Sequence, residues 1–145
     1  MTDTARAPEP EIRRNATLVA GSMLATFAAL RLYLSFAPDT DLNVGPYNIH
    51  HLYSGLLVLI AGAIPLALFR EKRITWPLLA LGAGLGMTLD EWVFLIATNG
   101  SNTAYLAPVS WWGAVVMIAL ACLYIAALSW RVRQQIEKTD ARASQ

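Results

Sequence analysis

Charged residues are scarce in this chain: they make up 14% of its 145 residues, while hydrophobic residues make up 56%. A soluble domain usually carries about 25% charged residues. The net charge of +1 provides no basic surface for nucleic acid. The single cysteine, Cys122, excludes an intramolecular disulfide, and no zinc motif surrounds it. The composition therefore indicates that lipid surrounds most of the chain.

Four long apolar runs are present, and each is long enough to cross a bilayer. A span needs about 20 mostly apolar residues, and its backbone must be hydrogen-bonded within the segment, which requires a helix. We predict an all-α membrane protein whose domain, 15–131, is a bundle of four transmembrane helices. The predicted spans are 16–36, 49–69, 76–97 and 109–130, with tails at 1–14 and 132–145. The polar ends, Met1–Glu11 and Lys138–Gln145, are expected to be poorly ordered.

Basic residues mark one side of the predicted bundle. Ten of the eleven lysines and arginines flank the spans at that side: Arg6, Arg13, Arg14, Arg70, Lys72, Arg73, Arg131, Arg133, Lys138 and Arg142. The loops 37–47 and 98–108 contain none. Basic loops stay in the cytoplasm, so both termini are predicted to be cytoplasmic. The expected location is the cell inner (plasma) membrane, crossed several times.

Ionisable residues inside the spans all fall in the predicted outer halves. They are Arg31, His50, His51, Asp90 and Glu91. At 1.5 Å per residue, each lies within roughly 10 Å of the outer boundary. An unpaired charge in a span costs a few kcal/mol, so such residues face the bundle interior and find partners there. We therefore predict that these five side chains form one polar cluster.

Small residues predict which helix faces pack together. Two adjacent stripes run along the third span: Gly82, Gly86 and Asp90, then Gly84, Thr88 and Glu91. A third stripe on the second span contains His51, Gly55, Val58 and Gly62. Glycines let helices approach closely in lipid, so these stripes are expected to pack against each other or against the first span. That packing brings His51 towards Asp90 or Glu91.

Aromatic residues are interpreted as an interfacial belt, because Trp and Tyr favour the membrane interface. The residues assigned to it are Tyr33, Tyr47, Tyr53, Trp92, Tyr105, Trp111 and Trp112.

A metal site is the first chemistry that the cluster suggests. His50, His51, Asp90 and Glu91 offer imidazole and carboxylate ligands for Zn, Mn or Fe. A metal-bound water could then hydrolyse or modify a lipid-linked substrate. In that hypothesis Glu91 is a ligand or a catalytic base, and Arg31 holds an anionic group. Against it, adjacent side chains on a helix point about 100° apart, so the four do not easily reach one point.

Two alternatives need no metal. In one, Arg31 binds an anionic outer-leaflet lipid or small molecule, and Glu91 or Asp90 acts as acid or base. In the other, the protein is a non-enzymatic membrane subunit or small transporter. Its cluster then fixes helix register, or conducts a proton or ion across a homo-oligomer. The sequence leaves these alternatives open, and it leaves open whether the protein is an enzyme.

Two short motifs resemble those of a known group. "IHHLYSG" at 49–55 and "GAGLGMTLDE" at 82–91 resemble the IHHxxxG and LDE elements of small uncharacterised prokaryotic integral membrane proteins. In that group the two elements lie on consecutive helices. The matching positions are His50, His51, Gly55, Asp90 and Glu91. The resemblance implies no activity, but it implies that the histidine and acid pairs belong to one unit.

Overall fold

The computed structural model describes residues 9–37, 40, 43–44, 47–69 and 75–143. In chain order the elements are α1 (Glu9–Phe36), β1 (Asn43–Val44), β2 (Tyr47–Asn48), α2 (His51–Leu68), α3 (Thr75–Ala97), α4 (Asn102–Tyr105) and α5 (Pro108–Ala143). The two-residue strands β1 and β2 pair antiparallel between α1 and α2. The predicted all-helical bundle is therefore confirmed, with this small hairpin added to it.

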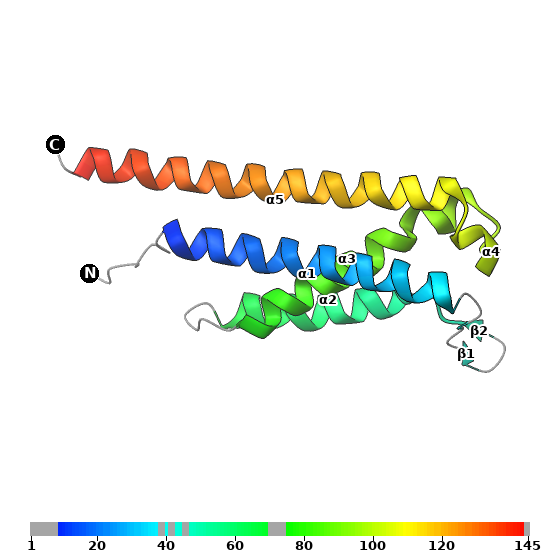
Figure 1. Cartoon of the computed structure of the whole chain (residues 1–145). Coiled ribbons are helices and arrows are strands. Elements are labelled where there is room, and N and C mark those ends of the chain that lie inside the picture. Colours follow the sequence, from blue (N-terminus) through cyan, green and yellow to red (C-terminus); the bar gives the residue numbers. More distant parts are fainter. Residues whose placement is uncertain (1–8, 38–39, 41–42, 45–46, 70–74, 144–145) are drawn as a thin grey trace.

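Four of these helices, α1, α2, α3 and α5, are long and apolar enough to cross a membrane. They contain or closely match the four predicted spans, which supports a multi-pass membrane protein. Figure 1 shows that α1 starts, and α5 ends, at the same end of the bundle, called here the terminal end. The hairpin and α4 lie at the opposite end, called here the α4 end.

The prediction that both polar ends are poorly ordered is wrong for residues 9–11 and 138–143, while residues 1–8, 144 and 145 lie outside the described part of the chain. α1 already begins at Glu9, and α5 continues to Ala143, well past the last apolar residues. The end of α5 is rich in Gln, Glu, Lys, Arg and Ala, which are good helix formers outside lipid as well. The two ends also meet, because Arg133 Nη1 lies 3.5 Å from Glu9 Oε1.

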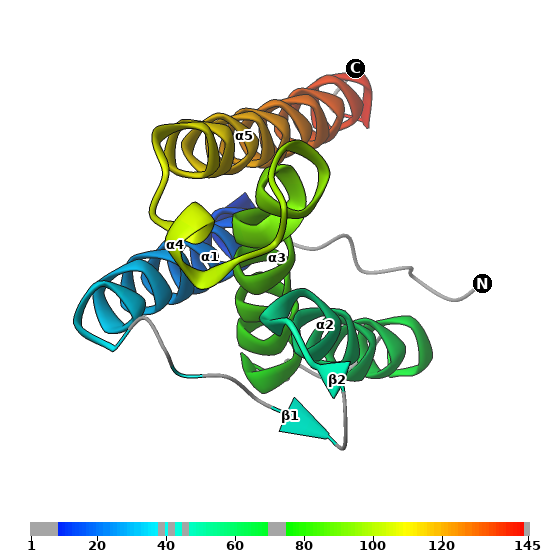
Figure 2. The same cartoon turned by 90° about the vertical axis from the view of Figure 1, so that its right-hand side faces the viewer.

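α3 occupies the centre of the bundle. Of its most apolar 18-residue stretch, 39% is buried, against 11% for each of the other three long helices. Viewed along the bundle, α1, α2 and α5 surround it (Figure 2). A central helix contacts every neighbour, so its residues are the ones that can link all the others.

The glycine stripes of α3 face two different helices. A Cβ on Gly84 would come within 2.5 Å of the Leu59 backbone nitrogen on α2. A Cβ on Gly86 would come within 2.6 Å of the Met23 carbonyl oxygen on α1. On α2, Gly55 approaches Met87 and Thr88 equally closely. The predicted stripe packing is confirmed: one stripe of α3 faces α2, and the other faces α1.

Candidate functional site

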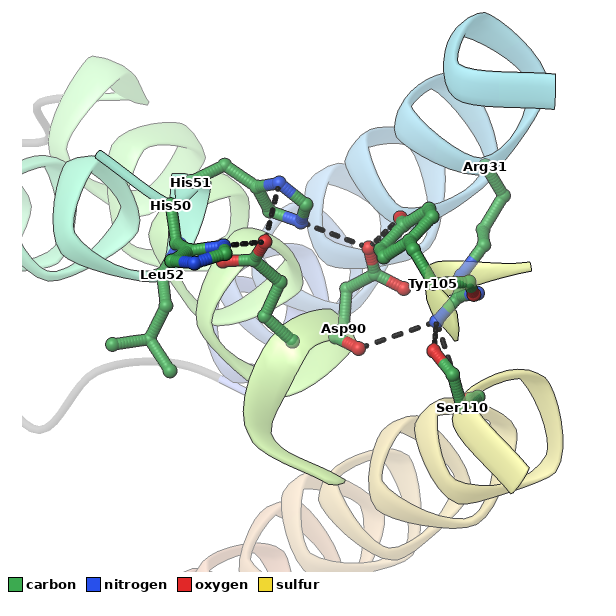
Figure 3. A network of polar contacts seen from close by, with 8 residues as sticks. Arg31, His50, His51, Leu52, Asp90, Tyr105 and Ser110 are labelled. Atoms are coloured by element: carbon green, nitrogen blue, oxygen red, sulfur yellow. Dashed lines mark hydrogen bonds and ion pairs between the residues drawn. The ribbon is translucent and has the colours of Figure 1, made fainter. Parts of the chain in front are cut away.

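The side chains of all five predicted residues come together at the α4 end. Figure 3 shows how Arg31, His50, His51 and Asp90 lie within this cluster. Arg31 comes from the last turns of α1, and Asp90 and Glu91 come from α3. His51 is the first residue of α2, and His50 precedes it as the N-cap. The prediction of one polar cluster is therefore confirmed. The cluster joins residues of α1, α2 and α3, of which Arg31 and Asp90 are far apart in sequence.

Asp90 is the most enclosed member of the cluster, with no exposed side-chain surface. Arg31 Nε donates to Oδ1 of Asp90 at 2.6 Å. The other carboxylate oxygen, Oδ2, accepts a short hydrogen bond from the Tyr105 hydroxyl and lies 3.0 Å from His51 Nε2. A buried carboxylate is tolerated only when it is paired and hydrogen-bonded, and Asp90 meets both conditions.

Arg31 is buried and fastens four helices together. Beyond its bond to Asp90, Nη1 donates to the Tyr105 carbonyl at 3.0 Å. Nη2 lies 3.2 Å from both the carbonyl and the hydroxyl oxygen of Ser110 on α5, and 3.3 Å from the Asp90 carbonyl. The guanidinium also lies 4.2 Å from the centre of the Tyr105 ring, within cation–π range. Its donors are thus directed at protein acceptors, and the predicted binding of an anion stays a prediction.

Glu91 has a different set of partners from its neighbour. Its Oε1 lies 3.2 Å from Nδ1 of His50 and 3.2 Å from Nδ1 of His51. Its Oε2 accepts the Leu52 backbone N–H at 2.7 Å. That N–H belongs to the first turn of α2, where helices leave N–H groups unsatisfied and favour negative charge. The N-cap His50 makes no side-chain cap bond, so Glu91 of α3 caps α2 instead.

His51 lies between the two acids. Its Nε2 faces Asp90 and its Nδ1 faces Glu91, so each ring nitrogen has a different carboxylate as its partner. The ring also packs edge-on against Tyr105, with centroids 5.7 Å apart. The cluster is therefore a connected chain that runs from His50 through Glu91, His51 and Asp90 to Arg31.

The prediction of an interfacial belt is wrong for Tyr105. This residue is buried on α4 and donates to Asp90. Burial, and after it the Asp90 carboxylate, raises the pKa of the Tyr105 phenol above its ordinary range. The phenol therefore keeps its proton and stays a donor. The only sequence signal for its position was Asp90 itself, an acid that needs more donors than the predicted cluster supplied.

One buried hydroxyl near the cluster has no hydrogen-bond partner within the described part of the chain. Thr88 Oγ1 lies on α3, one turn before Glu91, on the face that α2 covers. Such groups are few in folded proteins. Its neighbour on α2 is Gly55, which leaves little space between the two helices.

Metal coordination by the four predicted ligands stays a prediction. In the part of the chain that the structure describes, no group of three or more His, Cys, Asp or Glu side chains is arranged to hold a metal ion. The two histidines approach the acids from the α2 side, while Arg31 and Tyr105 occupy the far side of Asp90.

Comparison with known proteins adds no assignment. No family model, no curated protein and no solved structure matches the chain. The resemblance to the IHHxxxG and LDE group therefore stays a prediction, and any function must be argued from the geometry of the cluster.

Proposed function

We propose that the cluster is a proton-binding site near the outer face of a plasma-membrane protein, and that the protein is a non-enzymatic subunit or small transporter. The observation that carries this proposal is the position of His51. Its ring nitrogens lie 3.0 Å from Asp90 and 3.2 Å from Glu91. Histidine is the side chain whose ordinary pKa allows it to change charge near neutral pH, so it is suited to pass a proton between two acids.

The charges of the cluster support one exchangeable proton. An ionised carboxylate oxygen can only accept a hydrogen bond. His51 Nε2 is hydrogen-bonded to Asp90, and its Nδ1 lies within ion-pair distance of Glu91, so a protonated His51 is the state that balances the two acids when both are ionised. Together with Arg31 the four groups then sum to zero charge. Transfer of the proton from His51 to either acid leaves this sum unchanged, which is favourable for a buried group.

The two acids are unequal, and this gives the exchange a direction. Asp90 is fixed by Arg31 and Tyr105 and has no exposed surface. Glu91 is held by two histidines and a backbone N–H, and its partner His50 is the most exposed member, at 23%. We infer that protons enter and leave through His50 and Glu91, while Asp90 and Arg31 hold the inner end fixed.

The orientation is part of the proposal. It rests on the basic residues that flank the apolar runs in the sequence; of these, Arg13, Arg14, Arg131, Arg133, Lys138 and Arg142 are described and lie towards the terminal end. The α4 end, which carries the cluster, is then the outer end. On α1, the hydroxyls of Thr17 and Ser22 already donate to carbonyls of their own helix, and no acidic or basic side chain lies in the inner half of a described span. Exchange with the outer face is therefore favoured over a complete path through one copy.

Nitrogen-15 NMR of histidine-labelled protein, purified without a histidine tag, tests the proposal. The chain has only two histidines, so His50→Gln and His51→Gln assign both pairs of signals. We expect the His51 signals and the infrared carboxyl band of Glu91 to change over the same pH interval, because they share one proton. In Glu91→Gln the His51 titration should move to a different pH. In His50→Gln the titration of His51 should remain coupled to Glu91.

Two results would overturn the proposal. One is a His51 titration that is identical in the wild type, Glu91→Gln and Asp90→Asn, which would mean that no proton is shared. The other is a pair of metal-shifted nitrogen signals that a chelator abolishes, together with stoichiometric metal in the purified protein. That second result would favour the predicted metal site. If a variant fails to fold, the wild type still decides: the metal result needs no variant, and a His51 signal and a carboxyl band that change over different pH intervals would also overturn the proposal.

A further inference from the structure

Phe94 lies between the two ends of the polar cluster. It belongs to α3, one turn beyond Asp90, and only 2% of its surface is exposed. Its ring packs edge-on against His50, with centroids 5.8 Å apart, and against Tyr105, with centroids 5.4 Å apart. His50 pairs with Glu91, whereas Tyr105 donates to Asp90. A side chain without any polar atom therefore separates a partner of one acid from a partner of the other.

Asp90 has three side-chain partners in the described part of the chain, and only one of them can exchange a proton with it. Arg31 stays charged, because a guanidinium is not deprotonated in proteins. Tyr105 keeps its phenolic proton, because burial and the neighbouring carboxylate raise its pKa. The remaining partner is His51, whose Nε2 lies 3.0 Å from Oδ2 of Asp90. A second route to Asp90 would therefore have to be supplied by water.

Aromatic rings pack around this inner end of the cluster. The Arg31 guanidinium lies 5.9 Å from the centre of the Phe27 ring and 5.7 Å from the centre of the Trp111 ring. The His51 ring packs against Tyr105, with centroids 5.7 Å apart. Aromatic rings whose centroids lie about 4.5 to 7 Å apart are in direct contact, so they exclude water from the space between them. On the side of the exposed His50, the ring that does this is Phe94.

We propose that Phe94 insulates the Asp90–Arg31 pair, so that protons pass between His51 Nε2 and Asp90 Oδ2 and by no shorter route from His50. This inference rests on the proposed function and adds a positioning residue to it. Phe94 carries no proton itself and acts by excluding water. Without its ring, water from the exposed side of His50 would reach the Asp90 carboxylate directly, and the exchange would lose its order.

Exchange of the Tyr105 hydroxyl proton with the solvent measures access to the inner end. In a mixture of light and heavy water, tyrosine labelled with carbon-13 at Cζ gives separate OH and OD signals when this exchange is slow. Fast exchange gives one averaged signal. Tyr105→Phe identifies the Tyr105 signals among those of the five tyrosines. We expect separate signals for Tyr105, which is buried and donates to Asp90, and one averaged signal for the exposed Tyr53.

Three substitutions test the insulation. In Phe94→Ala the space left by the ring lies beside polar groups and admits water, so the two Tyr105 signals should merge. In Phe94→Leu the side chain stays large and apolar, so the signals should remain separate. Phe27→Ala is the matched control, because it removes an equal ring that packs on Arg31 and Trp111 instead of on His50. The Tyr105 signals should remain separate in this control as well.

Two results would contradict the insulation by Phe94. One is a pair of separate Tyr105 signals in Phe94→Ala that is folded by circular dichroism. The other is merging in Phe27→Ala, which would mean that any cavity beside the cluster admits water. If Phe94→Ala does not fold, the wild type still decides, because Tyr105 exchange as fast as that of Tyr53 would also contradict the inference. A His51 titration that is independent of both acids would overturn the proposed function instead, and the Tyr105 exchange is measured separately from it.

Discussion

Adjacent acids in a membrane helix look interchangeable in a sequence, but Asp90 and Glu91 have different partners. Asp90 faces α1, where it meets the guanidinium of Arg31. Glu91 faces α2, where it meets both histidines and the Leu52 N–H. The 100° turn between neighbouring residues of a helix produces this separation. One acid therefore contributes mainly to holding helices together, while the other remains close to the exposed His50.

Removing Arg31 should destabilise the protein strongly. Arg31→Gln leaves the Asp90 carboxylate buried without its cation, and breaking a buried pair in this way costs about 3 to 5 kcal/mol. We expect this loss in the free energy of unfolding, measured in mixed micelles with increasing SDS. Arg131→Gln, at an exposed position, should change it by no more than about 0.5 kcal/mol.

A second substitution shows whether the pair itself is responsible. In Arg31→Gln/Asp90→Asn no unpaired charge remains, so part of the lost stability should return, with a coupling energy of about 0.5 to 3 kcal/mol. If the double variant loses as much stability as the two single variants together, the ion pair does not hold α1 to α3.

At the scale of elements, the close approaches of α3 explain why its glycines are spaced as they are. Gly82 and Gly86 face α1, and Gly55 and Gly84 bring α2 and α3 together. Close contact brings the backbones near enough for Asp90 and Glu91 to reach side chains on both neighbours. Helix packing and the polar cluster therefore depend on the same periodic pattern in α3.

Two glycines allow a matched test of this packing. In Gly84→Ala the new Cβ would lie 2.5 Å from the Leu59 nitrogen, so α2 must move; we expect a loss of about 1 to 3 kcal/mol in the free energy of unfolding. In Gly21→Ala nothing lies within 4 Å, and the better helix propensity of alanine should add up to about 1 kcal/mol. Thermal unfolding in one detergent compares both with the wild type. Equal shifts would mean that the α2–α3 contact does not limit stability.

Periodic features of the sequence predicted the long helices and the cluster. Structural features without a sequence period, such as α4 and the position of Tyr105, were not predicted. Four apolar runs and glycines spaced by four repeat along a helix, so each can be recognised locally. α4 has four residues and a single N-cap, Ser101, so its sequence resembles an ordinary turn. Tyr105 fits a membrane interface as well as a buried site. Which acid would meet Arg31 depended on the rotation of α3, which no local pattern specifies.

At the scale of the whole molecule, the two ends of the bundle have opposite chemistry. The α4 end contains the cluster, where acids and bases neutralise one another. The terminal end carries basic residues of α1 and α5, among them Arg13, Arg14, Arg131 and Arg133. The proposed proton exchange would then face one side of the membrane only, so its biological meaning depends on the orientation of the bundle.

Cysteine labelling in intact cells tests that orientation. Cys122 is first replaced by alanine, so that no native cysteine remains. Thr103 on α4 and Ala141 near the end of α5 are both exposed, and each is then replaced by cysteine. A membrane-impermeant maleimide should label Thr103→Cys in intact cells. It should label Ala141→Cys only after the membrane is permeabilised, and the reverse pattern would invert the proposed topology.

The cap that Glu91 places on the Leu52 N–H has a consequence for biogenesis. The two residues are 39 positions apart, so the ribosome makes the start of α2 long before its cap exists. During insertion the first turn of α2 therefore stays incomplete until α3 has entered the bilayer and turned Glu91 towards it. The second and third spans are then expected to mature as one hairpin.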